Sequence, residues 1–127
     1  RAEFCTPEST PGADEYFPIE MGLLAEKLNV TNQTYLVITS RGSSVDALGL
    51  PSLLKTKAAY IGVIGSKRRW ATTVKALKEK GVADELISKV RSPMGLELQA
   101  ETPEEIAVSI MAEVLMVKEK GSGKPMG

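Results

Sequence analysis

The sequence contains no histidine and only one cysteine, and each shortage excludes a class of function. Without histidine the chain lacks the most common general base and metal ligand, and Ser-His and Cys-His nucleophile pairs are excluded. The single Cys5 excludes an internal disulfide and a metal site built from several cysteines. Because Cys5 lies in a stretch of loop-like composition, we interpret it as an incidental small residue rather than a functional thiol.

The chain also lacks an excess of charge, because 16 basic residues balance 16 acidic ones. No overall field would therefore draw it to nucleic acid or to an anionic membrane, and neither is expected as a partner. The longest mostly apolar stretch, residues 106–117, is shorter than the ~20 residues that cross a bilayer. With no secretory signal, the expected location is the cytoplasm. Because the chain opens on Arg1 rather than methionine, we expect it to belong to a longer product.

What the sequence does contain is an alternation of strand-like and helix-like stretches. Strands are predicted where short apolar or β-branched runs occur, at 15–17, 35–39, 60–64 and 96–98. Helices are predicted where the composition and spacing are helical, at 19–28, 66–80, 84–90 and 102–120. A further segment of helical composition, 46–57, should break into two short pieces, because it contains Gly49 and Pro51. This alternation predicts an α/β fold with a mainly parallel sheet flanked by helices.

The last predicted helix has the clearest boundaries. Thr102 and Glu105 have the spacing of a capping box, with a proline at the first helical position. In the centre of this helix only Ser109 and Glu113 are polar. So narrow a polar stripe predicts a helix buried on most sides, against the sheet and against a second surface such as a partner protomer. The tail, 121–127, is predicted to be disordered.

Residues 60–69 form the most informative stretch, because they predict a buried strand, a glycine turn and three consecutive cations at a helix start. Each cation is disfavoured there by roughly 0.3–1 kcal/mol, since this end of the helix dipole is positive. An anion near Gly65 and Ser66 would reverse that sign, because free amides and cations would converge on it. Two alternatives stay open: the cations simply extend into solvent, and Ser66 only caps the helix.

Three predicted loops follow strands, at the edge of an α/β sheet where ligands bind: 40–43, 65–68 and 92–95. They offer glycine amides, hydroxyls and guanidinium groups but almost no carboxylate, which suits phosphate or another oxyanion. Arg41 could equally anchor a backbone carbonyl. Glu101 is a weaker candidate, chosen because helix capping explains the neighbouring glutamates but not this one. The candidate cofactor-binding residues are Arg41, Gly42, Gly62, Gly65, Ser66, Lys67, Arg68 and Glu101. No catalytic residue or metal ligand is predicted.

Three stretches of the chain resemble the C-terminal Rossmann-like domain of XdhC/CoxI proteins, which are accessory factors of xanthine dehydrogenase and related molybdenum hydroxylases. They are 60–68, 92–96 and 100–110. Residues 1–4 resemble the segment that follows the second strand of that domain. The resemblance therefore implies a Rossmann-like domain over 1–120 that lacks its first strand-turn-helix. The Gly-x-Gly-x-x-Gly fingerprint, which would follow that missing strand, is absent from the sequence.

The family is associated with binding molybdenum cofactor, protecting it during sulfuration and delivering it to the apo-enzyme. The resemblance implies an accessory factor rather than an enzyme, with molybdenum cofactor or an NAD(P)-type nucleotide as ligand. It also implies a molybdenum hydroxylase apo-enzyme as partner. A homodimer is expected through the helix at 102–120. The chain departs from the family at Ser43, where histidine is frequent, and at Gln99, where glycine is common.

Two other classes of function stay open from the sequence. An NAD(P)-dependent oxidoreductase fragment is compatible with the α/β alternation, although no acid/base partner is visible in a chain without histidine. A non-catalytic dimerisation module is compatible with the apolar helix at 102–120.

Overall fold

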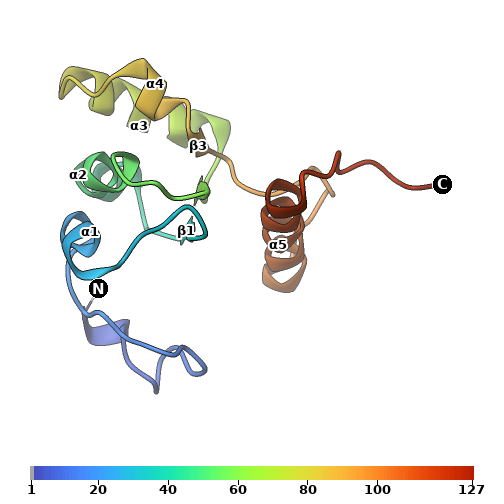
Figure 1. Ribbon diagram of the computed structural model, residues 1–127, viewed down its shortest axis with the longest axis horizontal. Coiled ribbons are helices and arrows are strands. Elements are labelled where there is room, and N and C mark those ends of the chain that lie inside the picture. Colours follow the sequence, from blue (N-terminus) through green and yellow to red (C-terminus); the bar gives the residue numbers. More distant parts are fainter. Residues whose placement is uncertain (1) are drawn as a thin grey trace.

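A three-stranded parallel sheet forms the centre of the computed structural model, which describes residues 2–127 (Figure 1). The strands are β1 (Tyr35–Ile38), β2 (Tyr60–Val63) and β3 (Val90–Arg91), in the order β1-β2-β3. The main helices are α2 (Ser43–Leu54), α3 (Lys67–Glu79) and α5 (Pro103–Glu119). Short helices are η1 (Ala2–Phe4), η2 (Met21–Leu23), α1 (Leu24–Lys27) and α4 (Asp84–Ile87). The predicted α/β class with a parallel sheet is confirmed.

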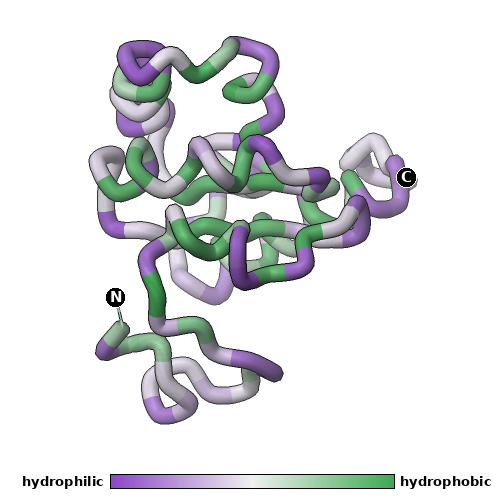
Figure 2. The backbone as a smooth tube through the Cα atoms, turned by 60° about the vertical axis from the view of Figure 1, so that its left-hand side comes forward, coloured by the Kyte–Doolittle hydropathy of each residue, from purple (hydrophilic) through white to green (hydrophobic). Residues whose placement is uncertain are grey.

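The two faces of the sheet pack against different helices. Successive residues of a strand point to opposite faces. Ile61 and Val63 of β2 join one apolar cluster with Leu50 of α2 and Leu77 of α3. Tyr60 points to the other face, where it joins a second cluster with residues of α5. The apolar segments that form these clusters run through the centre of the molecule in Figure 2. Burial on both faces explains why β2 is uniformly apolar.

Helix α2 is continuous through Pro51, so the predicted break into two short pieces is wrong. A proline in a helix interior leaves the carbonyl four residues earlier without its usual donor. Here that carbonyl belongs to Ala47, and Lys80 Nζ at the end of α3 donates to it at 3.0 Å. Gly49 also has a packing role, because a Cβ there would overlap the Met21 side chain. The full burial of three leucines adds to the stability of this helix: Leu50, Leu53 and Leu54.

Two of the predicted strands, at 15–17 and 96–98, are absent from the part of the chain that the structure describes. Residues 15–17 have no strand beside them, because the N-terminal segment lies away from the sheet (Figure 1). At 96–98 the chain pairs with α5 instead, since Leu96 N–H donates to Ser109 O at 3.1 Å. The third strand is β3, which begins at Val90, inside the range where the spacing predicts a helix. The helices predicted at 19–28 and 84–90 are correspondingly shorter than expected.

Helix α5 has the predicted capping box, and its narrow polar stripe faces the sheet. The polar residues Ser109 and Glu113 face inward and are buried. Val108, Met111 and Leu115 are outward and expose 61%, 60% and 58% of their surface. Glu113 faces inward because its polar partners lie on the sheet side of the helix. Burial of the outer side against a second surface, such as a partner protomer, stays a prediction.

The capping box makes the stability of α5 depend on pH. Backbone amides of Thr102 and Glu101 donate to Glu105 and lower the pKa of its carboxyl below the ordinary 4.5. A carboxyl whose pKa is lowered in the folded state stabilises the fold at pH values above its ordinary pKa. This stability is lost as the pH falls through the lowered pKa. We therefore expect Glu105→Gln to be destabilising near neutral pH and to approach wild type at a pH well below the lowered pKa, where the glutamate is protonated. Urea unfolding at both pH values measures this. An unchanged difference at both would contradict the assigned role.

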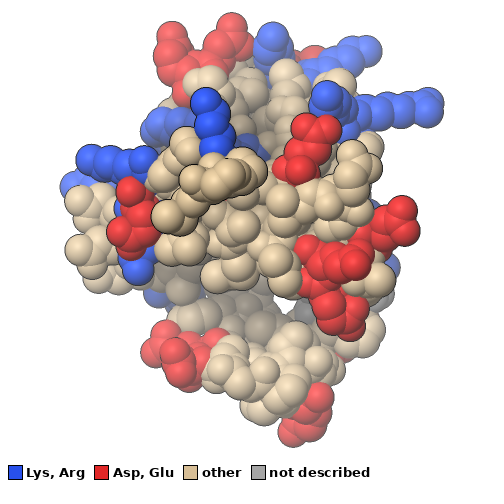
Figure 3. Space-filling view, turned by 90° about the vertical axis from the view of Figure 1, so that its right-hand side faces the viewer, with Lys and Arg blue, Asp and Glu red and all other residues tan. Residues whose placement is uncertain are grey.

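The N-terminal segment, residues 2–17, stands apart from the body of the molecule in Figures 1 and 2. Its hydrogen bonds stay local: the backbone amides of Cys5 and Thr10 and the Tyr16 hydroxyl all donate to backbone carbonyls inside this segment. In the space-filling view of Figure 3 an open gap separates this lower lobe from the rest of the molecule. At the other end, residues 121–127 form no helix or strand. Disorder of that tail and the domain boundary at 120 stay predictions.

Among residues 2–127, no helix combines the length and the apolar character that crossing a membrane requires.

Candidate functional site

The three loops expected to form a site do meet at the carboxyl edge of the sheet. Ile64 N–H donates to Ile38 O at 2.9 Å, which places the ends of β1 and β2 side by side. Ser92 Oγ and Met94 N–H both donate to Val63 O, at 3.0 and 3.1 Å. The loops at 40–43, 65–68 and 92–95 therefore surround one end of β2.

The turn after β2 has the geometry that an anion would need. Ser66 is the N-cap of α3, and its hydroxyl accepts from Arg69 N–H at 3.1 Å. The amides of Lys67 and Arg68 lie in the first helical turn, where no preceding helical carbonyl is available to accept from them. Gly65 has a φ of +143°, and a Cβ there would lie 2.9 Å from Arg69 Cδ. Both the backbone and the close contact thus favour glycine at this turn.

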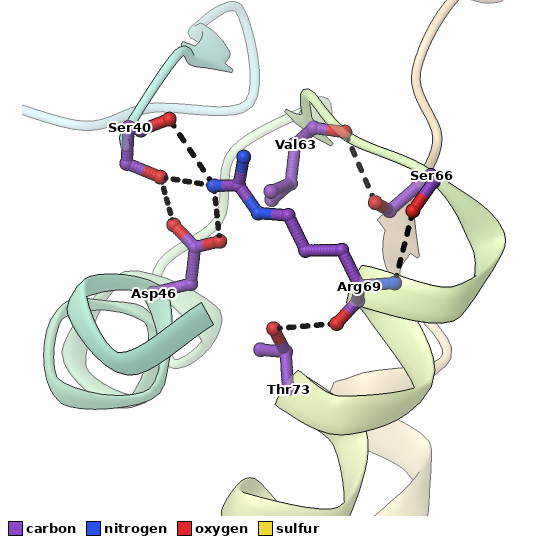
Figure 4. A network of polar contacts seen from close by, with 7 residues as sticks. Ser40, Asp46, Val63, Ser66, Arg69 and Thr73 are labelled. Atoms are coloured by element: carbon purple, nitrogen blue, oxygen red, sulfur yellow. Dashed lines mark hydrogen bonds and ion pairs between the residues drawn. The ribbon is translucent and has the colours of Figure 1, made fainter. Parts of the chain in front are cut away.

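The three consecutive cations do not share one role. Lys67 and Arg68 are exposed at the start of α3, as an anion site requires. Arg69 instead turns inward, towards β1 and α2 (Figure 4). Its Nη2 lies 3.0 Å from Asp46 Oδ2 and donates to Ser40 O and Ser40 Oγ at 3.1 and 2.9 Å. Arg69 is therefore a link between the loops and does not belong to an exposed cation cluster.

Asp46 is a residue of this site that sequence reasoning did not single out. Its side chain is completely buried, whereas the paired Arg69 side chain retains 23% exposure. Ser40 Oγ also donates to Asp46 Oδ1, so both carboxylate oxygens have partners. Among the buried side-chain nitrogen and oxygen atoms of residues 2–127, Arg69 Nε is the one that has no hydrogen-bond partner. The only sequence signal was a carboxylate placed at the start of an otherwise apolar helix.

The remaining candidates occupy different surroundings. Arg41 is exposed beside Ser40, and Gly42 is the N-cap residue of α2. Gly62 lies inside β2, where a Cβ would overlap the Tyr60 phenol, which gives this glycine a packing role. Glu101 lies before α5, where its amide donates to Glu105. No hydrogen bond or ion pair within residues 2–127 joins Glu101 to the three loops.

The groups at this edge fit a phosphate. First-turn amides and three exposed cations (Arg41, Lys67 and Arg68) are present. The nearby carboxylate of Asp46 is already paired with Arg69, so it would not repel an anion as a free charge would. In contrast, residues 2–127 contain no group of three or more side chains suited to hold a metal ion. Either cofactor suggested by the sequence carries a phosphate that these donors could bind.

A second polar cluster attaches α5 to the sheet. Tyr60 Oη donates to Glu113 Oε1 at 2.7 Å, and Gly95 N–H donates to the same oxygen at 3.1 Å. Arg91 Nη1 lies 3.8 Å from Glu113 Oε2. Burial raises the pKa of the Tyr60 hydroxyl, and its hydrogen bond to Glu113 and the charge of that carboxylate raise it further. Tyr60 thus stays protonated and acts as a permanent donor in this contact.

A basic hollow of about 620 Å³ lies at the opposite, amino end of β2 and β3. Three of the residues that line it are cations, Lys57, Lys89 and Arg91. Lys89 Nζ is 3.5 Å from Leu54 O, and Arg91 pairs with Glu113. Two of its three cations therefore have structural partners, and the carboxyl edge remains the better candidate site.

Comparisons with known proteins agree with this architecture. The chain is 33% identical over 95% of its length to the uncharacterized protein YqeB of Escherichia coli K12, and covers 22% of that protein. It is 28% identical over 94% of its length to a protein of Bacillus subtilis named as a probable component of xanthine dehydrogenase, and covers 34% of it. A crystal structure of a xanthine dehydrogenase from Bacillus halodurans matches with a TM-score of 0.76 and 29% identity. That match covers 94% of this chain and 35% of the other.

The chain thus spans about a quarter to a third of these relatives. A family model described as the XdhC Rossmann domain matches residues 1–114, which is most of the chain. The resemblance drawn from residues 60–68, 92–96 and 100–110 is therefore confirmed. The chain belongs to the XdhC Rossmann-domain family.

Proposed function

We propose that this chain is the cofactor-binding part of an accessory factor that serves a molybdenum hydroxylase of the xanthine dehydrogenase type. It holds a phosphate-bearing cofactor, molybdenum cofactor or an NAD(P)-type nucleotide, and aids its insertion into the apo-enzyme in the cytoplasm. Family membership and relatives named as xanthine dehydrogenase proteins support the link to that enzyme class. The role is that of a binding protein, since the site offers amides and exposed cations, and the nearby carboxylate of Asp46 is paired with Arg69.

One observation carries the binding part of the proposal. The first turn of α3 presents backbone amides at the carboxyl edge of β2, and its first two residues, Lys67 and Arg68, are exposed cations. An oxyanion there would accept from the helix start and would be attracted by both cations. Arg69, held by Asp46, fixes the first turn of α3 against the loop that carries Arg41. This geometry does not select between a pterin phosphate and a nucleotide phosphate.

Isothermal titration with molybdopterin, NADH, NADPH and inorganic pyrophosphate tests the proposal. At least one probe should bind the wild-type chain, and Lys67→Ala/Arg68→Ala should weaken it by roughly tenfold or more, about 1.4 kcal/mol. Affinity should also fall as salt is added, because the contacts are exposed and ionic. Lys55→Ala/Lys75→Ala is the matched control, since it removes two exposed cations elsewhere. No heat from any probe, or equal weakening by both double variants, would reject the proposed site.

A further inference from the structure

The basic hollow at the amino end of β2 and β3 has charges of one sign in its wall. Lys57 lies in the segment before β2, Lys89 directly before β3, and Arg91 within β3, so separate parts of the chain bring cations to one place. Of the described residues that line the hollow, none is acidic. Because the whole chain balances 16 basic residues against 16 acidic ones, this wall is a local excess of positive charge.

The three cations of the hollow retain donors for a ligand. Lys57 is exposed, and its ammonium has no hydrogen bond or ion pair within residues 2–127. Lys89 Nζ lies 3.5 Å from Leu54 O, which occupies only one of the N–H donors of this ammonium. The Arg91 side chain is 46% exposed and lies 3.8 Å from Glu113, too far for a hydrogen bond.

The size and the polar groups of the hollow indicate the class of ligand. Its volume of about 620 Å³ is in the range of small-molecule sites, roughly 300–1,000 Å³. The hydroxyls in the wall are already used, since Thr56 Oγ1 donates to Leu53 O at 2.6 Å and Ser88 Oγ to Glu85 O at 2.8 Å. Recognition therefore rests on the cations. Cations from separate parts of the chain favour a ligand with several negative charges along it, and a short chain of phosphate groups has this chemistry.

Contacts within the fold explain only part of this positive charge. The carboxyl end of α2 carries about half a negative charge, and Lys89 Nζ contacts the Leu54 carbonyl at that end. Glu113 adds one negative charge beside Arg91. The three cations still exceed these charges by about one unit or more, and a bound anion would neutralise this excess.

The basic hollow is separate from the carboxyl edge at which the cofactor site is proposed. It lies at the start of β2, whereas the first turn of α3 follows the end of this strand. At about 3.3 Å per residue, the length of β2 holds the two regions roughly 10 Å or more apart. No single phosphate group contacts both, so binding at each region is measured independently.

We propose that the basic hollow is a second anion site, which binds a short chain of phosphate groups through Lys57, Lys89 and Arg91. The chain is either a free polyphosphate or the tail of a nucleotide. Because Arg91 also pairs with Glu113 of α5, the negative charge of Glu113 weakens binding in the hollow. This inference goes beyond the proposed function and does not depend on anion binding at α3.

Amide NMR spectra of the chain, recorded during titration with inorganic tripolyphosphate, test the second site. Signals of residues 56–61 and 88–91 should shift and saturate, and Lys57→Ala/Lys89→Ala should weaken this binding by about tenfold or more. Lys67→Ala/Arg68→Ala should leave it unchanged, because signals of 65–68 report the α3 site separately. Lys27→Ala/Lys75→Ala is the matched control, since it removes two exposed cations that do not line the hollow. No saturable shift at the hollow, or equal weakening by all three double variants, would overturn the proposal.

Other probes identify the source of the phosphate chain. ATP should shift the same signals: tighter binding than that of tripolyphosphate identifies a nucleotide as the ligand, and equal binding identifies the free chain. Binding of ATP without binding of tripolyphosphate would overturn the proposal, because the cations would then not recognise the phosphates. Inorganic phosphate should bind about tenfold more weakly or less, since one group does not reach all three cations, and affinity equal to that of tripolyphosphate would overturn the proposal.

Glu113→Gln supplies a test in the opposite direction. It removes the negative charge beside Arg91 and keeps an oxygen that accepts from Tyr60 and Gly95, so tripolyphosphate should bind about threefold more tightly. A loss of affinity that came only from a disturbed fold would have the opposite sign. Unchanged or weaker binding by Glu113→Gln would contradict the role of Arg91 and overturn the proposed site.

Discussion

Replacing Arg69 with methionine is expected to lower the free energy of unfolding by about 3–5 kcal/mol, the cost of leaving a buried charge without its partner. The Asp46 side chain is completely buried, and Arg69 Nη2 at 3.0 Å is its charged partner. Methionine would retain much of the side-chain volume but none of the hydrogen bonds to Ser40. Urea unfolding of the variant and wild type, analysed at a common slope, gives the difference directly.

The neighbouring cations supply the control for this prediction. Lys67→Met and Arg68→Met should not lower the free energy of unfolding and should raise it by at most about 1 kcal/mol, because both side chains are exposed and their charge is disfavoured at a helix start. The double variant Asp46→Leu/Arg69→Met should recover a large part of the loss, since an apolar pair can replace a buried ion pair. An Arg69→Met variant as stable as Lys67→Met would contradict the assigned role. In that case the loops would need another explanation for their arrangement.

This difference matters for the proposed function, because it separates stability from binding within three consecutive residues. Arg69 is expected to affect binding only through the position of α3 relative to the Ser40 loop. Substitution of Lys67 and Arg68 should affect binding with no loss of stability. A sequence alone cannot make this distinction, since the partner of Arg69 is 23 residues away, on another helix.

The elements that the sequence predicts well are those whose stability is local or whose burial is uniform. The strand over 60–64 is an unbroken apolar run, and it is buried on both faces. The start of α5 is marked by Thr102 and Glu105, whose capping contacts involve only nearby residues. Ser66 caps α3 in the same way. The loops of the candidate site follow from these strand and helix ends, so their common location could also be predicted.

The elements that were missed depend on contacts between distant residues. Pro51 is tolerated because Lys80, 29 positions further along the sequence, donates to the carbonyl that the proline leaves free. The strand β3 is only two residues long, too short for any periodic pattern. The inward direction of Glu113 could not be predicted, because polarity alone indicates solvent and its partner Tyr60 is 53 residues away.

Replacing Glu113 with alanine is expected to lower the free energy of unfolding by about 2–6 kcal/mol. The substitution leaves the buried Tyr60 hydroxyl and the Gly95 amide without their acceptor, at about 1–3 kcal/mol for each such group if no water enters. Arg91 should contribute little of this, because it is about half exposed and 3.8 Å away. Urea unfolding measures the total, and hydrogen exchange along α5 shows whether the helix detaches from the sheet.

Two conservative variants identify the cause of that loss. Glu113→Gln keeps an oxygen that can accept from Tyr60 and Gly95, so it should cost less than Glu113→Ala. Tyr60→Phe removes one donor and should cost about 1–2 kcal/mol. If Glu113→Gln were as harmful as Glu113→Ala, the charge rather than the hydrogen bonds would be the main attachment. The expected order instead makes Glu113 the residue that orients α5, and this orientation is what leaves Met111 and Leu115 facing outward.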